Sequence, residues 1–153
     1  MLPAFRAASV TDPDAHELLA EYFAMRAAGF DPVAGSYRTV FPDPARFTEP
    51  AGVFLVVDAA GSPAGCGGIR MLDADRAEVK HLYLRDTVRG RGWGRLLLAE
   101  LERHARELGA TEAVLDTNVA LEAAGSLYRS SGYVEIPPYN DNPNATTWFR
   151  KEL

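Results

Sequence analysis

The run of arginine and glycine between residues 89 and 95 is the segment whose residue types point most directly to chemistry. It reads Arg89-Gly90-Arg91-Gly92-Trp93-Gly94-Arg95. Glycines at alternate positions let the backbone turn tightly and expose successive N–H groups, and a helix that begins there adds the positive end of its dipole. Arginines at a helix N-terminus oppose that dipole unless an anion is bound. The segment therefore predicts a binding loop for a phosphorylated ligand, such as a nucleotide or a pyrophosphate-bearing cofactor.

The spacing of this loop excludes two common nucleotide motifs. A dinucleotide fingerprint would need a glycine where Arg95 stands, and a Walker loop would need Gly-Lys followed by Ser or Thr, which is absent. The pattern that remains is Arg-x-x-Gly-x-Gly, formed by Arg89, Gly92 and Gly94.

Two further blocks accompany the loop. The first reads Ala77-Glu78-Val79-Lys80-His81-Leu82-Tyr83-Leu84, and the second reads Leu127-Tyr128-Arg129-Ser130-Ser131-Gly132-Tyr133. In this order and approximate spacing, the three blocks resemble the acetyl-CoA signature of the GNAT superfamily of acyl-CoA-dependent N-acyltransferases. The resemblance is strongest from Glu78 to Tyr133 and weakest from Phe30 to Pro50, where family members differ most.

The resemblance implies one α/β (α+β) domain over residues 1–153, with a mixed, mostly antiparallel twisted sheet of about seven strands flanked by about four helices. It also implies that the strand of Glu78 splays away from the strand at 112–117. The pantetheine arm of CoA would enter this gap beside the backbone of Leu82, Tyr83 and Leu84. The donor would be acetyl-CoA, attacked directly by a primary amine, with no metal involved.

Glu78 lies eleven residues before Arg89, where similar family members carry a general base. A lysine-like amine with a pKa of about 10.4 is about 99.9% protonated at pH 7, so some group must accept its proton at a cost of about 4 to 5 kcal/mol. A free carboxylate is a weak base, and burial or a water relay would have to help. The alternative is an exposed strand carboxylate paired with Lys80, and the sequence leaves both open.

Tyr128 matches the tyrosine that, in related enzymes, faces the sulfur of CoA and acts as general acid. Proton transfer from a phenol with a pKa of about 10 to a thiolate of about 8.5 runs uphill by about 2 kcal/mol, so hydrogen bonding to the sulfur would suffice. The alternative is an aromatic side chain of a helix packed in the core.

The acceptor pocket should come from the aromatic-rich segment 30–47 and from the loop 137–143, because loops carry specificity on a fixed scaffold. The expected substrate contacts are Tyr37, Arg38, Glu78 and Tyr139. Glu78, Asp116 or Asp141 could attract a cationic amine, whereas Arg38 or Arg70 could hold a substrate carboxylate. The sequence does not decide between these acceptors.

Periodicity and turn residues predict the elements that position these groups. Helices are expected at 14–28, 92–108 and 122–131, with at most a short one in the proline-rich segment 30–50. Strands are expected at 5–10, 53–58, 64–72, 77–84, 112–117, 133–136 and 146–151.

Length and composition suit a single domain, since 153 residues that are 47% hydrophobic can bury about 70% of the unfolded surface. The net charge of −5 argues against a nucleic-acid partner. Cys66 is the only cysteine, which excludes an intrachain disulfide, and it is expected to pack in the core. The chain shows no leader pattern and no apolar run of about 18 residues, which predicts a cytoplasmic protein without a membrane partner. Related folds often dimerise, so a homodimer is left open.

The function expected from these features is acetyl transfer from acetyl-CoA to the amine of a small molecule or an amino acid. A CoA-binding sensor or regulatory module without activity is the alternative, although such a binder would need neither Glu78 nor Tyr128. A phosphotransferase would need a loop lysine and a pair of magnesium carboxylates, which are lacking. A protein N-terminus or lysine stays open as acceptor.

Overall fold

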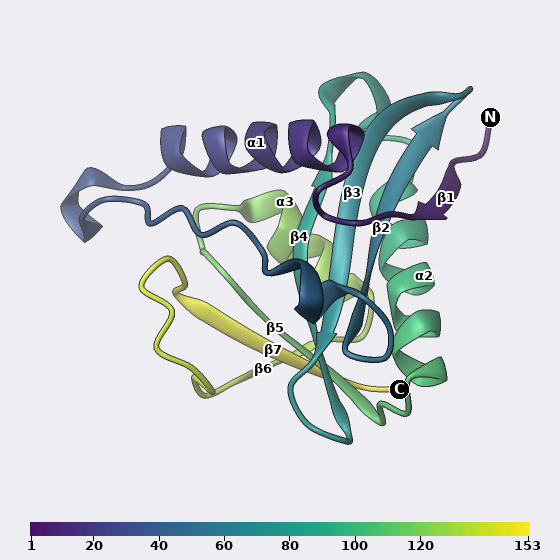
Figure 1. Cartoon of the computed structure of the whole chain (residues 1–153). Coiled ribbons are helices and arrows are strands. Elements are labelled where there is room, and N and C mark those ends of the chain that lie inside the picture. The colour runs from purple at the N-terminus through teal and green to yellow at the C-terminus, as the bar shows by residue number, and fades with distance from the viewer.

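The computed structural model describes residues 1–153, and its strands form one seven-stranded sheet in the order β1-β2-β3-β4-β5-β7-β6 (Figure 1). The strands are β1 (Ala4–Ala7), β2 (Gly52–Ala59), β3 (Ser62–Met71), β4 (Arg76–Leu84), β5 (Glu112–Thr117), β6 (Val134–Ile136) and β7 (Thr147–Glu152). Every neighbouring pair is antiparallel except β4 and β5. The expected mixed, mostly antiparallel sheet is therefore confirmed.

Three α-helices flank this sheet, rather than about four: α1 (Pro13–Ala28), α2 (Trp93–Glu107) and α3 (Glu122–Ser130). The proline-rich segment between Phe30 and Pro50 forms only two short 3₁₀ turns, η1 (Pro32–Ala34) and η2 (Pro44–Phe47), each of which begins at a proline that follows an aspartate N-cap. A third 3₁₀ turn, η3 (Asp86–Val88), follows β4. The first strand ends at Ala7 rather than Val10, since the Asp12 carboxylate accepts from the N–H groups of Asp14 and Ala15 and begins α1.

The two longer helices cover opposite faces of β2, β3 and β4. Val53, Leu55 and Val57 of β2 pack in one cluster with Leu97 and Leu101 of α2. The alternate residues Phe54 and Val56 pack in a second cluster with Leu18 and Leu19 of α1, together with Cys66, which is fully buried as expected. Because successive side chains of a strand point to opposite faces, the sheet lies between α1 and α2 (Figure 1).

The parallel pair β4 and β5 separates after three residues. Backbone pairing joins Arg76 to Glu112, Ala77 to Ala113 and Glu78 to Val114, and neither strand pairs with the other beyond Glu78 (Figure 1). The predicted splay is confirmed. It leaves one edge of β4 without a neighbouring strand from Lys80 to Leu84, so that its N–H and C=O groups are open to a ligand.

A β-bulge bends β4 within this open stretch. Cys66 of β3 pairs with Tyr83 and Gly68 with Lys80, so the single Gly67 lies opposite both His81 and Leu82. His81 has a φ of 59°, in the left-handed region that non-glycine residues seldom adopt. The thiol of Cys66 donates to the carbonyl oxygen of His81 at 3.4 Å, which supports the bulge from the core side. Bulges of this kind redirect a strand near functional sites.

Candidate active site in the split sheet

The gap between β4 and β5 holds a cavity of about 770 Å³, within the range of small-molecule sites. Residues 79–84 of β4 form one wall, and the other walls come from α1, the end of β5, α3 and the loop 140–144. The direction of β4 sets the two ends of the cavity. Leu84, Arg89 and Gly94 lie at the end beside the glycine-rich loop, whereas Lys80 and Asp116 lie where the strands begin to separate.

The glycine-rich loop has the backbone shape that an anion site needs. Gly90 and Gly92 have φ values of 78° and 77°, and Gly92 precedes the first residue of α2. A Cβ at either glycine would meet nothing within 4 Å, so these positions require glycine for backbone conformation rather than for space. No side chain caps the N-terminus of α2, which leaves its first N–H groups for a ligand. The loop therefore fits a pyrophosphate group.

The arginines and the tryptophan of the loop have different positions. The Arg89 side chain lines the cavity, where its Nε donates to the Leu84 carbonyl at 2.9 Å and its guanidinium pairs with Asp86. Arg91 lies over the Trp93 ring at 5.8 Å, and that ring is only 2% exposed within the core. Arg95 bonds Ser130 Oγ at 2.8 Å and does not line the cavity. Of the residues expected at the cofactor, Arg89 and Gly94 thus line the cavity, whereas Trp93 and Arg95 do not.

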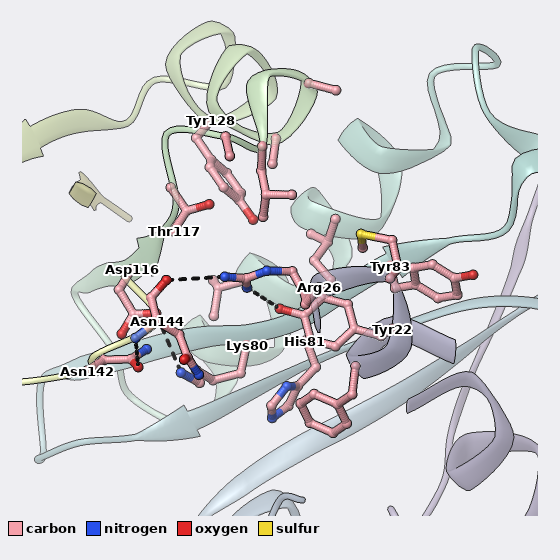
Figure 2. Close-up of a pocket in the computed structure, with 18 of the residues that line it drawn as sticks. Tyr22, Arg26, Lys80, His81, Tyr83, Asp116, Thr117, Tyr128, Asn142 and Asn144 are labelled. Carbon is pink, nitrogen blue, oxygen red and sulfur yellow. Dashed lines mark hydrogen bonds and ion pairs between the residues drawn. The ribbon is translucent and has the colours of Figure 1, made fainter. Parts of the chain in front are cut away.

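Tyr128 presents its hydroxyl to the cavity from α3. The residue is 7% exposed, and its ring packs against Tyr133 and Phe149 with centroids 5.9 and 6.0 Å away. Figure 2 shows the hydroxyl pointing from α3 toward the guanidinium of Arg26. Burial raises the pKa of Tyr128, so the phenol stays protonated and can donate a hydrogen bond. The side chain therefore combines the core packing and the site position that the sequence left as alternatives.

Glu78 is 1% exposed and uses both carboxylate oxygens inside the protein. Oε1 accepts from Arg70 Nε at 2.8 Å, and Oε2 accepts from the Tyr139 hydroxyl at 2.6 Å. Burial, reinforced by the charge of Glu78, raises the pKa of Tyr139 and keeps its phenol a donor. Neither Glu78 nor Tyr139 lines the cavity, whereas the predicted contacts Tyr37 and Arg38 do. Glu78 is thus neither exposed nor paired with Lys80.

Lys80 pairs instead with Asp116 of β5, across the place where the strands begin to separate. Lys80 Nζ lies 3.6 Å from Asp116 Oδ1, and Asp116 Oδ2 accepts from Asn140 Nδ2 at 2.7 Å. Asn140 in turn accepts from Trp148 Nε1 at 2.9 Å, which fixes the loop 140–144 to β7. Asp116 lines the cavity with a side chain that is 7% exposed and whose two oxygens already have these partners.

His81 contributes a neutral imidazole to the same wall. Its ring lies 5.8 Å from Tyr22, 5.5 Å from Phe23 and 5.8 Å from Phe47. Burial, together with the positive charges of Lys80, Arg70 and Arg26, lowers the pKa of His81 to about 3. The ring therefore carries no charge at neutral pH.

Arg26 is the cavity residue that sequence reasoning missed. It is 9% exposed, yet it has no ion pair with a carboxylate. Its two terminal nitrogens donate to the Tyr22 hydroxyl at 3.1 Å and to the Asn144 carbonyl at 3.3 Å (Figure 2). Its guanidinium lies 5.1 Å from the Tyr37 ring centre. The sequence did contain a signal for this position: Arg26 follows Leu19, Tyr22 and Phe23 at helical spacing, which places it on the apolar face of α1.

Comparison with known proteins identifies the family of this fold and site. Residues 14–133 match the model of the Acetyltransferase (GNAT) family, and the chain belongs to that family. An uncharacterized N-acetyltransferase of Schizosaccharomyces pombe is 35% identical over 100 residues, which are 64% of this chain and 61% of that protein. An IAA acetyltransferase of Azospirillum brasilense is 34% identical over 87 residues, which are 56% of this chain and 57% of that protein. The matches thus span 57% to 61% of these relatives.

A solved structure supports the same fold over the full chain. The PaiA N-acetyltransferase of Thermoplasma acidophilum, in complex with coenzyme A, has a TM-score of 0.77 at 20% identity, with 100% of both chains covered. In the present chain, no cluster of three or more His, Cys, Asp or Glu side chains could hold a metal ion. None of its helices has the length and apolar character needed to cross a bilayer.

Proposed function

We propose that this chain transfers an acetyl group from acetyl-CoA to the primary amine of a small molecule, by direct attack of the amine. The observation that carries the proposal is the splay of β4 and β5, which makes one cavity from the glycine-rich loop to the polar end at Asp116. Membership in the GNAT family supports it, as does a structural relative solved with coenzyme A. A cytoplasmic location, expected from the sequence, and a homodimer, left open by the resemblance, stay predictions.

The donor would be held by backbone groups at two places. The N–H groups at the start of α2 and the side chain of Arg89 would bind the pyrophosphate, since donors at a helix N-terminus suit phosphate oxygens. The open edge of β4 at Leu82, Tyr83 and Leu84 would bind the pantetheine amides as a neighbouring strand would. When bound, acetyl-CoA supplies an activated acyl carbonyl and a thiol leaving group.

Three side chains, Tyr128, Asp116 and Glu78, would bind the amine and transfer protons during the reaction. The protonated Tyr128 hydroxyl would donate a hydrogen bond to the departing sulfur. Asp116 lines the cavity and would attract the cationic amine. Glu78 stays the proposed base. Because Glu78 does not line the cavity and its oxygens bind Arg70, which does, and Tyr139, which does not, the amine proton would reach it through a relay rather than by direct contact.

Titration calorimetry with acetyl-CoA, CoA and ATP, followed by thiol detection over a panel of amines, tests this function. We expect both CoA species to bind, ATP not to bind, and thiol release to require an amine. Binding of ATP without CoA would overturn the proposal. Binding of acetyl-CoA without thiol release for any amine would instead support the silent CoA-binding module.

A further inference from the structure

Arg26 is a buried cation that faces the cavity without an anion of its own. Three other cations that line the cavity pair with carboxylates: Arg70 with Glu78, Lys80 with Asp116, and Arg89 with Asp86. Arg38 also lines the cavity without an ion pair, but it is exposed to solvent. Arg26 has only the Tyr22 phenol and the Asn144 carbonyl. Removing a guanidinium from water costs several kcal/mol, and two neutral oxygens offset this less well than a carboxylate does.

Arg26 has unpaired N–H donors on a side chain that lines the cavity. A guanidinium has five N–H groups in a planar fork, and only two of them have partners within the protein. Arg26 lines the cavity, and no nitrogen of this side chain is both sealed from solvent and without a hydrogen-bond partner. The Tyr37 ring and the Tyr22 hydroxyl hold the group in place. A fixed fork of this kind fits a carboxylate, which can accept two parallel hydrogen bonds.

We propose that the amine acceptor carries a carboxylate a few bonds from its nitrogen, as an amino acid does, and that Arg26 binds this carboxylate. The inference rests on the proposed acetyl transfer and specifies its substrate class. Tyr128 and Arg26 face the same part of the cavity (Figure 2), so an amine near the acetyl group would bring a nearby carboxylate to the guanidinium. Asp116, in the same cavity, would attract the ammonium group before transfer.

The walls beside Arg26 favour an acceptor with an apolar side chain. Tyr22, Phe23 and Tyr37 line the cavity next to the guanidinium, and the neutral His81 ring lies against the first two. Aromatic walls give contact area without further charge. Arg38 and Arg70, the cations that the sequence suggested for a carboxylate, fit this role less well, because Arg38 is exposed and Arg70 already binds Glu78.

Matched acid and amide acceptors test the carboxylate site. Phenylalanine and phenylalaninamide share the amine and the ring but differ in the charge at the carboxyl position. In wild-type protein, kcat/KM should be higher for the acid, and Arg26→Gln should lower it about 10- to 150-fold, the contribution of hydrogen bonds to a charged group. The kcat/KM for phenylalaninamide should change little in this variant. Because the α-amine of phenylalaninamide is also less basic than that of phenylalanine, the mutant-to-wild-type ratio of kcat/KM is compared for each acceptor.

Controls separate failure of this inference from failure of the proposed function. Arg103→Met removes an exposed cation of α2 and should leave both ratios unchanged. Calorimetry should show unaltered acetyl-CoA binding in Arg26→Gln. Equal losses of kcat/KM for acid and amide in Arg26→Gln would overturn the carboxylate site. If no amine is acetylated, calorimetry with phenylalanine still tests it: binding that Arg26→Gln abolishes supports the site, and absence of binding overturns it.

Discussion

Replacing Glu78 with glutamine removes one negative charge from a buried cluster and leaves its shape nearly unchanged. The amide oxygen can still accept from Arg70 Nε, and the amide nitrogen can donate to the Tyr139 hydroxyl, so both contacts persist as weaker bonds. A hydrogen bond to a charged group contributes about 1.5 to 3 kcal/mol and a neutral one about 1 kcal/mol. We therefore expect Glu78→Gln to lower the free energy of unfolding by about 2 kcal/mol, which corresponds to a Tm decrease of about 4 to 8 °C at this chain length.

Urea unfolding of Glu78→Gln, Arg70→Met and the double variant measures this effect and the coupling between the two side chains. Glu152→Gln is the matched control, because Glu152 also pairs with an arginine, at 3.3 Å, but its side chain is 81% exposed and should contribute little. Stability equal to wild type in Glu78→Gln would refute the buried ion pair as a source of stability.

Activity of the same variant tests the base assignment. General-base catalysis contributes about 10²- to 10⁴-fold, so a relay that ends on Glu78 predicts a kcat/KM loss in this range for Glu78→Gln. The measurement uses protein well below its Tm, with acetyl-CoA saturating. A folded variant that keeps most of its kcat/KM would refute the base role and leave Glu78 as a residue that positions Arg70 and Tyr139.

Three further outcomes follow from the cavity and its walls. Tyr128→Phe should lower kcat/KM by about tenfold or less, since one hydrogen bond contributes about 1 kcal/mol, and a loss as large as that from disrupting the glycine loop would count against this ranking. Gly92→Ala and Gly61→Ala should each lower the free energy of unfolding by about 1 kcal/mol, because both glycines have positive φ. Only Gly92→Ala should raise KM for acetyl-CoA, and equal KM values for the two variants would contradict the assignment of the loop to the cofactor. His81 has a folded-state pKa of about 3, below that of the unfolded chain, so its protonation favours unfolding and stability present above about pH 6.5 is lost as pH falls toward 3. His81→Asn, which suits the left-handed backbone, should retain about 1 to 3 kcal/mol more stability than wild type at pH 4.5 relative to pH 7, as acid unfolding curves will show.

The parts of the site that sequence reasoning could predict are those set by local backbone chemistry. Alternating glycines imply a turn at Gly92 whatever lies around it, and the apolar repeat of α2 requires a helix to follow. Strand positions followed from the same patterns, with errors only at ends such as the turn after Ala7. The side-chain directions of Trp93 and Arg95 were less accessible, because each depends on which neighbour offers the better contact, the core for one and the Ser130 hydroxyl for the other.

The partners of charged residues lay beyond sequence reasoning for a related reason. Lys80 lies two residues from Glu78 on the same strand, which made their pairing a reasonable alternative. The ion-pair partners instead come from neighbouring strands of the sheet: β3 brings Arg70 to Glu78, and β5 brings Asp116 to Lys80. Arg26 shows the same limit, since its missing anion becomes apparent only when α1 is placed over the gap in the sheet.

The split between β4 and β5 accounts for the charges in its interior. Backbone pairing stops at Glu78 and Val114, and two residues further along each strand the side chains of Lys80 and Asp116 meet across the widening gap. A gap that admits a ligand also exposes backbone groups, so polar side chains are needed there in place of the apolar ones that line a closed sheet. Three cations of the cavity pair with carboxylates, and Arg26 is the buried cation there that has no such partner. The opening that gives the donor access to β4 therefore also leaves the positive charge of Arg26 beside Tyr128. An acceptor with its own carboxylate would supply the anion that Arg26 lacks.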